Sequence, residues 1–431
     1  MTTDSRIDPE PPPATPKKPG GGLWRNPDFM RFWIGETVSL FGVQVTALAL
    51  PLTAVYVLQA GPEELGGLRF AQFIPFLFLG LLFGALVDRR RKRPLMIFAN
   101  LARAVLIGLV PLLAFTDLLS MPLLFGIALV IGVFTVLFDV CWMSYVPVLV
   151  DKNHLMDANG KVSSSYSAAE LAGPGAAGLL VQVLSAPFAL VADALSYVVS
   201  VFMLAGIKRE EPLPAPSDQK RNIGSEIVEG LSFVLRHKYL RMIAALGASY
   251  NFCHMFIEAL FILFAIQVLG FGPGLIGLVL ALSAIGGLLG AMFAASLTKR
   301  LPFGFVYLMA VIIGFCSPIV VALATGPTAL AATMVVAGFM LERFGLAVAN
   351  ITAISLRQAV TPQRLMGRMT AGMRTLMYGL GTIGALVGGI LGGLLGLRTA
   401  LVIAAVAMAA AAIPLFFSTI PRLRTLPDAV D

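Results

Sequence analysis

The sequence predicts an all-α integral membrane protein in which twelve transmembrane helices form two six-helix, pseudo-symmetric lobes. Three observations lead to this prediction. First, 58% of the 431 residues are hydrophobic and only 13% are charged, whereas soluble domains carry about 25% charged residues. Second, the chain holds twelve apolar runs of the length that a helix needs to cross a bilayer, about 20 residues. Third, a membrane-boundary pattern in the first half recurs in the second half.

The boundary pattern is clearest at Gly80–Pro94, which reads GLLFGALVDRRRKRP. An apolar run meets Asp88 and then five consecutive cations, which require water or lipid head groups rather than hydrocarbon. A weaker copy with the same glycine spacing lies at Gly286–Leu301, GGLLGAMFAASLTKRL. Because the copy follows at about half the chain length, we expect two similar halves related by an axis along the membrane normal, with the substrate bound between them near mid-membrane.

The apolar runs divide the chain into five segments. Residues 1–27 contain PEPPPATPKKPGGG and cannot build a core, so we expect a disordered Pro-rich tail there. Residues 28–207 are expected to form the N-terminal six-helix lobe and residues 240–420 the C-terminal lobe, with a linker at 208–239 and a tail at 421–431. The expected spans are 32–58, 65–87, 95–115, 122–146, 164–185, 188–207, 240–269, 274–297, 303–324, 328–350, 368–394 and 398–420.

The linker has two parts of different composition. Its first part, KREEPLPAPSDQK, is rich in proline. Its second part places Ile227, Leu231, Val234 and Leu235 at helical spacing beside cations, which favours an amphipathic helix on the cytoplasmic surface of the membrane. A charged connector that only tethers the two halves fits the same composition.

Lys and Arg are distributed unequally between the two sides of the expected bundle. Loops that follow even-numbered spans hold nearly all of them, whereas the other side has only Arg69 and Arg398. The positive-inside rule then places both termini in the cytoplasm, and we expect a multi-pass protein of a bacterial cytoplasmic membrane. Because the cations that give the net charge of +8 lie in short loops between apolar spans, they set orientation and do not indicate nucleic-acid binding.

Motifs for catalysis are missing from the sequence. It has no HExxH, GxSxG or GxxxxGK[ST] pattern and no cluster of metal ligands, so neither an enzyme nor a nucleotide-driven pump is indicated. Cys141, Cys253 and Cys316 lie inside apolar runs without CxxC spacing and are read as small buried hydrophobes. We therefore expect no cofactor and no metal.

Several stretches resemble the major facilitator superfamily, and more narrowly its bacterial exporter branch for drugs, macrolides and siderophores, the transmembrane secretion-effector type. They are NPDFMRFWIGETVSLFGVQVTALALPL at 26–52, GALVDRRRKRPLMIFANLARA at 84–104, LFDVCWMSYVPVLV at 137–150 and AGPGAAGLL at 172–180. Each motif alone is modest evidence, but their order and spacing together are strong. The resemblance covers residues 26–422 and implies two six-helix lobes that expose a central site alternately to either side.

The loop after span two resembles the loop motif of this family. Its matching residues are Gly84, Asp88, Arg89, Lys92 and Arg93, while Arg91 stands where a second glycine is usual. In the family this loop braces the inward ends of the helices and helps to control switching. We expect Gly84 to allow close helix approach and Asp88 to accept hydrogen bonds or pair with a cation when that side closes; for the five cations, a role in topology alone suffices.

Span five carries a motif that resembles the antiporter motif of the family's exporters. Gly173, Pro174, Gly175 and Gly178 remove side-chain bulk and one backbone donor. A bendable helix with a close-packing face follows, although ordinary small-residue packing would also use these residues. The resemblance favours export over import.

Ionisable residues within spans are costly and are candidates for function. Arg103 and Asp139 each lie about 12 Å from the cytoplasmic end of their spans, so they could meet as a buried pair, either structural or proton-sensitive. Many proton-driven exporters carry a buried arginine in span four. This chain has none there, and Arg103 in span three is the available substitute. The other candidates are Glu36, Glu170, Asp193, Glu342 and Arg343.

The best polar stripe of the second half is on span seven. Asn251, His254 and Glu258 follow at spacings of three and four, hence on one helical face. Glu342 and Arg343 are adjacent and must point in different directions, so that one can line the cavity while the other pairs with a neighbouring helix. A proton-coupling carboxyl has to be buried, and the order of preference is Asp139, Asp193, Glu258 and Glu36.

These observations lead to one main expectation of function. The chain is expected to be a monomeric, proton-driven exporter of an amphipathic small molecule such as a drug, macrolide, siderophore or secondary metabolite, with the lipid bilayer as its surroundings. A proton-coupled importer of a metabolite is the alternative within transport, although few Asn, Gln or Trp residues lie in the spans. A structural membrane protein is the alternative outside transport.

Overall fold

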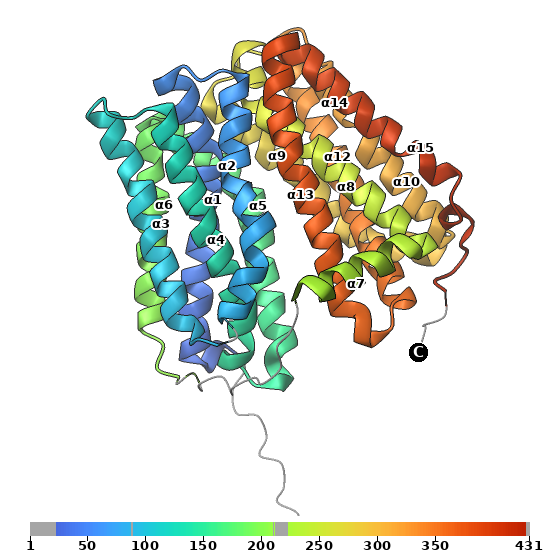
Figure 1. The fold of residues 1–431 in the computed structure, drawn as a ribbon. Coiled ribbons are helices and arrows are strands. Elements are labelled where there is room, and N and C mark those ends of the chain that lie inside the picture. Colours follow the sequence, from blue (N-terminus) through green and yellow to red (C-terminus); the bar gives the residue numbers. More distant parts are fainter. Residues whose placement is uncertain (1–22, 88, 210, 212–222, 428–431) are drawn as a thin grey trace, which may run out of the picture.

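The computed structural model describes residues 23–87, 89–209, 211 and 223–427. The described chain is helical, without strands, and its helices form two lobes that lie side by side (Figure 1). The N-terminal lobe contains α1 (Pro27–Leu58), α2 (Pro62–Val87), α3 (Lys92–Phe115), α4 (Met121–Leu149), α5 (Leu155–Leu184) and α6 (Ala186–Ala205). The C-terminal lobe contains α8 (Lys238–Gln267), α9 (Pro273–Arg300), α10 (Phe303–Cys316), α11 (Pro318–Ala322), α12 (Thr328–Val360), α13 (Gln363–Leu395), α14 (Leu397–Ala411) and α15 (Ile413–Phe416).

The predicted membrane fold is confirmed. Within the described residues, 11 helical segments are long and apolar enough to cross a membrane. This number treats α10 with α11, and α14 with α15, as single spans, which are interrupted close to Pro318 and Pro414 because proline removes a backbone donor. The 26-residue α2 packs against α4 and α13 and completes the twelve spans.

Several helices continue beyond the apolar runs from which they were predicted. The span expected at 328–350 is the 33-residue α12, which ends at Val360, and the span expected at 368–394 is α13, which begins at Gln363. Hydropathy marks only the part of a helix that lies in hydrocarbon, whereas the backbone hydrogen bonds continue into the polar region. The extensions all lie at one end of the molecule, where α1, α3 and α5 begin and α2, α4 and α6 end.

This end also carries most of the cations, and we call it the basic end. In Figure 1 it is at the bottom, together with the described C-terminus and the short helix α7 (Ile223–Arg236), which lies across the base of the C-terminal lobe. Helix α7 docks on α13: the backbone of Gly230 meets that of Arg368, and an ion pair of 2.5 Å joins Glu229 to Arg368. The linker helix is therefore held by the second lobe.

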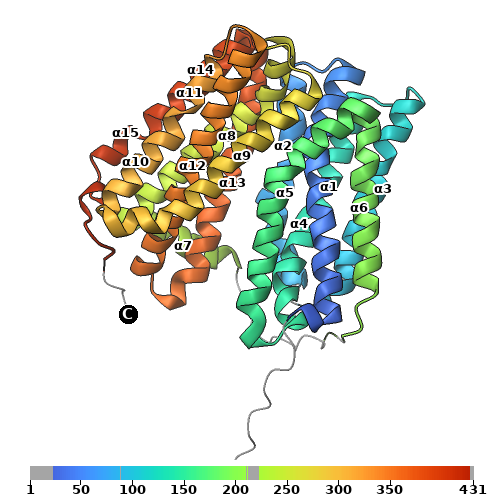
Figure 2. The same cartoon turned by 180° about the vertical axis from the view of Figure 1, so that it is seen from behind.

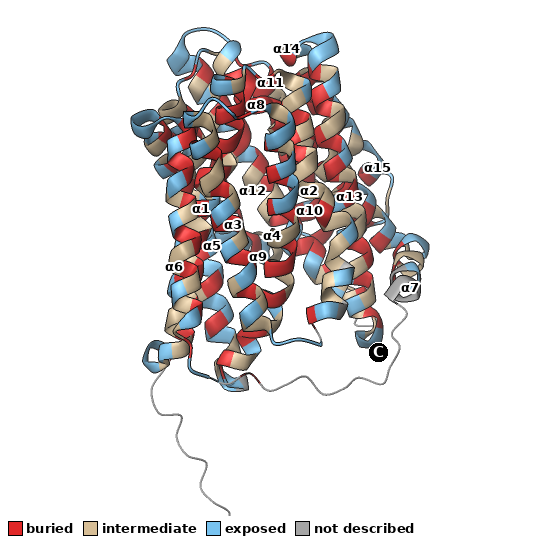
Figure 3. Cartoon of the chain, turned by 60° about the vertical axis from the view of Figure 1, so that its left-hand side comes forward, coloured by how far each residue is buried: buried red, intermediate tan, exposed pale blue. Residues whose placement is uncertain are grey.

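Large apolar side chains cover the outside of the bundle. Phe115, Phe202, Leu394 and Phe417 are each more than two thirds exposed, and exposed residues recur along the outward helix faces in Figure 3. Small residues and apolar side chains fill the helix contacts within each lobe. An exposed apolar surface of this kind is stable when the surrounding solvent is lipid.

The lobes meet through two helix crossings at the end opposite to the basic end. A Cβ atom added to Gly66 of α2 would lie 2.7 Å from Cα of Gly389 in α13, and one added to Gly178 of α5 would lie 2.9 Å from Cα of Gly277 in α9. The two crossings correspond through the internal repeat, because Gly277 lies 211 positions after Gly66 and Gly389 lies 211 positions after Gly178. Viewed from behind, α5 and α9 meet in the same way as α2 and α13 do in front (Figure 2). The interface thus has the twofold character that the repeat predicted.

Candidate functional site

A cavity of about 120 Å³ lies between the lobes below the glycine crossings. We call it the central cavity. Its polar lining comes from both lobes and consists of Gln44, Arg69, His254, Glu258, Glu342 and Arg343. Apolar side chains, among them Ile257, Phe261, Leu280 and Phe339, complete the wall. A cavity with apolar walls and a few convergent polar groups is the usual form of a small-molecule site.

Two ion pairs join the lobes at this level. Arg69 of α2 contacts Glu258 of α8 through a distance of 3.1 Å, and Arg343 of α12 contacts Glu170 of α5 through 2.5 Å. Arg69 is buried, whereas the Glu258 side chain is 38% exposed. Because each pair has one partner in each lobe, the charges contribute to the interface only while the lobes are close together at this depth.

A third polar group is confined to the C-terminal lobe. The Oε1 atom of Glu342 accepts a hydrogen bond of 3.0 Å from the Tyr250 hydroxyl and lies 2.9 Å from Nδ1 of His254. The rings of Tyr250 and His254 are stacked with their centroids 5.1 Å apart. Glu342 is buried, so these two partners satisfy a carboxyl that would otherwise be costly in the membrane.

Two further cavities line the interface between the central cavity and the basic end. One, of about 600 Å³, lies between α5 of the first lobe and α8, α9 and α12 of the second, and it shares His254 and Arg343 with the central cavity. The other, of about 330 Å³, lies between α2 and α4 on one side and α13 on the other. Within the described residues the interface is thus hollow toward the basic end and closed by the glycine crossings at the opposite end.

The polar stripe predicted on α8 is only partly present. His254 and Glu258 line the central cavity. Asn251 instead donates a hydrogen bond of 2.8 Å to the carbonyl of Gly247 in its own helix and packs against Gly381 of α13. The reason is that the contact between α8 and α13 covers the part of the α8 face on which Asn251 lies.

The adjacent residues Glu342 and Arg343 do point in different directions. Glu342 turns into its own lobe toward Tyr250 and His254, while Arg343 reaches α5 of the other lobe. Both nevertheless line the central cavity. Glu170, one of the ionisable candidates from the sequence, is the partner of Arg343 and lines the 600 Å³ cavity.

The expected pair of Arg103 and Asp139 does not form within the described part of the chain. The guanidinium of Arg103 donates to Asn100, one turn earlier on α3, and lies over the rings of Phe138 and Tyr197 at 4.4 Å each. Asn100 in turn bonds to Ser200 of α6 through 2.8 Å. The rotation of α4 places the ring of Phe138, and not the carboxylate of Asp139, over the guanidinium of Arg103.

Asp139 faces the interface between the lobes instead. It lines the 330 Å³ cavity together with Arg374 and Tyr378 of α13. Across this cavity Phe76 of α2 stacks on Tyr378 with a centroid distance of 6.1 Å. A carboxylate of the first lobe and an arginine of the second therefore border the same space.

Asp193 and Glu36 are both buried but have different surroundings. Asp193 has no exposed surface, and its two carboxylate oxygens accept hydrogen bonds from Thr46 of α1 and Ser196 of α6. It thereby ties α6 to α1 at Gly42, where a side chain would collide with it. Glu36 of α1 has a 6% exposed surface and no hydrogen-bond or ion-pair partner among the described residues.

The loop motif after α2 has its cations engaged within the N-terminal lobe. The backbone N–H groups of Lys92 and Arg93 donate to the carboxylate of Glu211, which also forms an ion pair of 3.3 Å with the Lys92 ammonium group. The Arg93 guanidinium donates to the carbonyls of Leu204 and Ala205 at the end of α6. These two cations therefore have structural partners beyond a role in topology.

The other members of the loop motif are less informative. Asp88 lies outside the described residues. Arg89 is exposed. A Cβ atom added to Gly84 would meet no atom of the described residues within 4 Å, so the expected close helix approach at Gly84 is wrong for this conformation.

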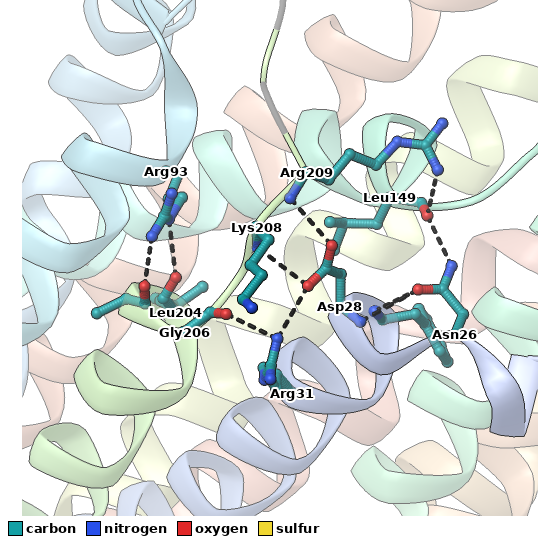
Figure 4. A network of polar contacts seen from close by, with 11 residues as sticks. Asn26, Asp28, Arg31, Arg93, Leu149, Leu204, Gly206, Lys208 and Arg209 are labelled. Carbon is teal, nitrogen blue, oxygen red and sulfur yellow. Dashed lines mark hydrogen bonds and ion pairs between the residues drawn. The ribbon is translucent and has the colours of Figure 1, made fainter.

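A polar network fastens the start of the linker to the same lobe (Figure 4). The carboxylate of Asp28, at the start of α1, accepts hydrogen bonds of 3.0 Å from the backbone N–H groups of Lys208 and Arg209. Arg31 donates to the carbonyl of Gly206 through 2.7 Å, and Arg209 donates to the carbonyl of Leu149 at the end of α4. Residues 206–209 and Glu211 are thus bound to the ends of α1, α3 and α4.

The glycine motif of α5 is divided between two contacts. Gly173 packs on Gln44 of α1 within its own lobe. Gly178 packs on Gly277 in α9 of the other lobe, and a Cβ atom added to Gly175 would lie 3.5 Å from Cβ of Ala281 in the same helix. Pro174 lines the central cavity. The motif therefore forms one of the two crossings that join the lobes.

Two residues of the site were not singled out from the sequence. Arg69 was read as a cation on the side poor in positive charge, and that exceptional position was the available signal. Tyr250 lies four residues before His254, so it shares the helical face on which the stripe was predicted. Among the described residues no group of three His, Cys, Asp or Glu side chains is placed to hold a metal ion.

Comparisons with known proteins agree with this architecture. The family model described as Major Facilitator Superfamily matches residues 32–383. Macrolide efflux protein A of Streptococcus pyogenes is 24% identical over 271 residues, which span 61% of this chain and 65% of that protein, a little less than two thirds of its length. The multidrug efflux pump Tap of Mycolicibacterium fortuitum is 26% identical over 403 residues, or 89% of this chain and 93% of the pump.

Solved structures with the same fold include transporters with quite different cargo. A bacterial homologue of the iron transporter ferroportin in an inward-facing state has a TM-score of 0.73 at 17% identity and covers 92% of this chain and 99% of its own. The nucleoside transporter NupG has a TM-score of 0.71 at 12% identity, with 90% and 98% covered. At such identities the likeness concerns the fold alone.

Proposed function

The chain belongs to the Major Facilitator Superfamily, and we propose that it exports amphipathic small molecules across the bacterial plasma membrane in exchange for protons. As a member of this superfamily it is a multi-pass membrane transporter of small substrates and not an enzyme. The direction of transport, the class of substrate and the coupling to protons are the proposal.

The observation that carries the proposal is the central cavity with its interlobe ion pair. Arg69 and Glu258 lie on opposite lobes and border the same space as the apolar side chains of Phe261 and Phe339. The apolar body of an amphipathic substrate would contact the apolar wall, and its polar or charged group would contact Arg69 or Glu258. Binding there would also compete with the contact between the lobes.

Alternating access follows from where the interface is hollow and where it is closed. We place the basic end in the cytoplasm, following the positive-inside rule. The hollow side of the interface then faces the cytoplasm, and the glycine crossings Gly66–Gly389 and Gly178–Gly277 close the outer side. Export requires that a substrate enters from the cytoplasm, that the hollow side closes, and that these crossings separate.

Coupling to protons is assigned to Glu258. A proton on this carboxyl would remove the negative charge that holds Arg69, and so would weaken the contact of the lobes at the cavity. Substrate and proton would then compete for the same interlobe charge, which is the requirement for an exchange of one for the other. The driving force is the proton gradient, and no cofactor takes part.

The relatives support export rather than import. Both proteins named above are called efflux proteins, one for macrolides and one for multiple drugs. The cavity itself supports an amphipathic substrate, since its polar groups are few and its walls are largely apolar. We propose that the chain acts as a monomer, because the central cavity is built from the two lobes of one chain.

The proposal is tested in proteoliposomes that contain the purified protein and a fluorescent amphipathic dye or a labelled macrolide. A proton gradient that drives protons toward the cytoplasmic face of the protein should drive the substrate toward the opposite face. Dissipation of the gradient should stop this movement of substrate. Glu258→Gln should abolish this gradient-driven movement, whereas Asp117→Asn in the loop between α3 and α4 should leave it unchanged. Movement that ignores the gradient would overturn proton coupling, and accumulation in the other direction would overturn export.

A further inference from the structure

A groove on the outer face of the C-terminal lobe lies away from the central cavity. It has a volume of about 500 Å³ and is bordered by α8, α13 and α14, with Leu235 of α7 at one end. None of the residues that line it comes from the N-terminal lobe. Nearby on α14, Ile403 and Val406 are 41% and 52% exposed, as expected of a surface that faces lipid. The groove is therefore open to the membrane and not to the transport path.

The lining of the groove changes along its length. Small side chains, namely Ala244, Ala248, Ala407 and Ala411, form its floor and walls, and Phe252 and Leu380 add apolar surface. The only charged residue among the lining residues is Arg241, which lies in the first turn of α8 next to the basic end. The groove thus combines an apolar channel within the membrane with a cation at its boundary.

Arg241 belongs to a group of cations that have no acidic partner. Within the described residues, Arg236, Lys238 and Arg241 form no ion pair with a carboxylate. Two cations at the same end of the other lobe are paired, Arg31 with Asp28 and Lys92 with Glu211. Among the described residues these three cations therefore have no counter-charge, and an anion from outside the chain would supply it.

The start of α8 adds to this need for an anion. The N-cap residue His237 gives no side-chain hydrogen bond to the first turn, and that turn has no acidic residue. A helix N-terminus favours negative charge, so Lys238 and Arg241 add positive charge where the helix already supplies it. Burial and the neighbouring charge of Lys238 lower the pKa of His237. Within the described residues its buried Nδ1 has no hydrogen-bond partner.

We propose that this groove binds an anionic phospholipid from the leaflet at the basic end. The phosphate of the head group lies at Lys238 and Arg241 beside the N-terminus of α8, and one acyl chain lies along the alanines of α8 and α14. Basic pockets between helices on the cytoplasmic side are suited to anionic head groups. A volume of about 500 Å³ is within the range of sites that enclose a small ligand.

The site also has a mechanical connection to the interface between the lobes. Helix α13 borders the groove through Leu376 and Leu380, and the opposite side of the same helix packs on α2 of the other lobe at Gly389. Helix α7, which reaches the groove through Leu235, is fastened to α13 by Glu229 and Arg368. A lipid in the groove therefore touches two elements that have to shift when the lobes rock.

The test uses the full-length protein in detergent with dioleoyl-phosphatidylglycerol as the probe. Native mass spectrometry should show one retained molecule, and thermal unfolding should shift upward on titration with this lipid. The zwitterionic dioleoyl-phosphatidylethanolamine should bind much more weakly. Lys238→Gln with Arg241→Gln should weaken binding of phosphatidylglycerol about 30-fold, at about 1 kcal/mol for each cation near the surface.

Two further variants keep the test decisive. Lys299→Gln with Arg300→Gln removes two cations in the last turn of α9, at the basic end, and should leave binding unchanged. Ala407→Phe, at an exposed position of the groove, should block the acyl chain; Ala245→Leu replaces it if that variant does not fold.

Three outcomes would overturn the proposal. They are equal affinity for the two lipids, unchanged binding in the α8 double variant, and displacement by inorganic phosphate, which would identify a site for a free anion. A loss of binding in the α9 double variant equal to that in the α8 variant would also count against it, because the attraction would then be unspecific.

Discussion

Arg69 and Glu258 face each other across the two lobes with 3.1 Å between nitrogen and oxygen, although they are 189 positions apart in the chain. The first is buried on α2 and the second borders the central cavity on α8. A charge pair with one member in each lobe depends directly on the relative position of the lobes. It is therefore the contact through which substrate, proton and conformation can be linked.

The first prediction concerns the charges of this pair. Arg69→Gln and Glu258→Gln should each reduce transport by about tenfold or more, equivalent to about 1.4 kcal/mol, because each leaves the partner charge alone at the interface. The exchange Arg69→Glu with Glu258→Arg should restore part of the activity. Substrate transport in proteoliposomes measures both effects, and a double variant as inactive as the single ones would show that the pair has no role of its own.

The second prediction concerns the glycine crossings. A leucine at Gly178 would collide with the backbone of α9, where Pro273 O and Gly277 Cα lie 2.7 and 2.9 Å from an added Cβ. Gly178→Leu should therefore favour the state in which the lobes are separated at the end that carries the crossings, which is opposite to the basic end. Gly389→Leu should do the same by colliding with α2. Spin-label distances between the lobes, measured at that end, should increase for both variants.

The control for the crossings is Gly126→Leu on α4, where an added Cβ atom meets no described atom within 4 Å. It should leave the spin-label distances unchanged. If Gly178→Leu and Gly389→Leu also left them unchanged, the crossings would not be what holds the lobes together at that end.

The third prediction separates a structural from a coupling role for Asp193. Its carboxylate is fully buried between Thr46 and Ser196. Asp193→Asn keeps one acceptor and should retain gradient-driven transport. Asp193→Leu removes the acceptor of the buried Thr46 hydroxyl, while Ser196 keeps its bond to the backbone carbonyl of residue 193, and this loss should destabilise the protein by about 1–3 kcal/mol. Thermal unfolding in detergent and transport are measured together. An Asn variant that folds normally but ignores the proton gradient would assign coupling to Asp193.

The fourth prediction concerns Glu211 at the base of the N-terminal lobe. Its carboxylate caps α3 through the N–H groups of Lys92 and Arg93 and pairs with the Lys92 side chain. Glu211→Gln keeps hydrogen-bonding capacity but loses the charge at the helix N-terminus, so the lobe should lose about 1 kcal/mol of stability. A faster proteolytic cleavage in the linker, with the first lobe otherwise folded, would be the corresponding readout. Glu64→Gln, at the start of α2, serves as a control that should leave that rate unchanged.

Hydropathy, charge asymmetry and the internal repeat were sufficient to predict twelve spans in two lobes, because these properties depend on the chain alone. The same information placed His254, Glu258, Glu342 and Arg343 near one another only in part. Depth follows from the position along a helix, and equal depth was the basis on which Arg103 and Asp139 were expected to pair. Rotation about the helix axis depends on packing against neighbours, and for that reason the pair expected between them does not form.

Other misses have the same origin. Arg69 lies in the second turn of α2, close to the loop, and nothing in its neighbourhood in the sequence indicates a partner on α8. Asn251 has the correct spacing for the polar stripe but is covered by α13 at Gly381. Contacts between lobes join residues far apart in the chain, and only the pairing of helices in space decides them.

The two glycine crossings have a consequence for the origin and assembly of the chain. Gly66 contacts Gly389, and the equivalent residue Gly277 contacts Gly178, the equivalent of Gly389. Each half thus contributes the same surface with the same two contact points, which is the arrangement of an isologous twofold dimer. A polypeptide of half the length, carrying both surfaces, would pair with a second copy through the same contacts. The present chain therefore has the architecture of a fused homodimer. Its halves, produced as two separate polypeptides cut within the linker, are expected to find each other in the membrane and to restore transport.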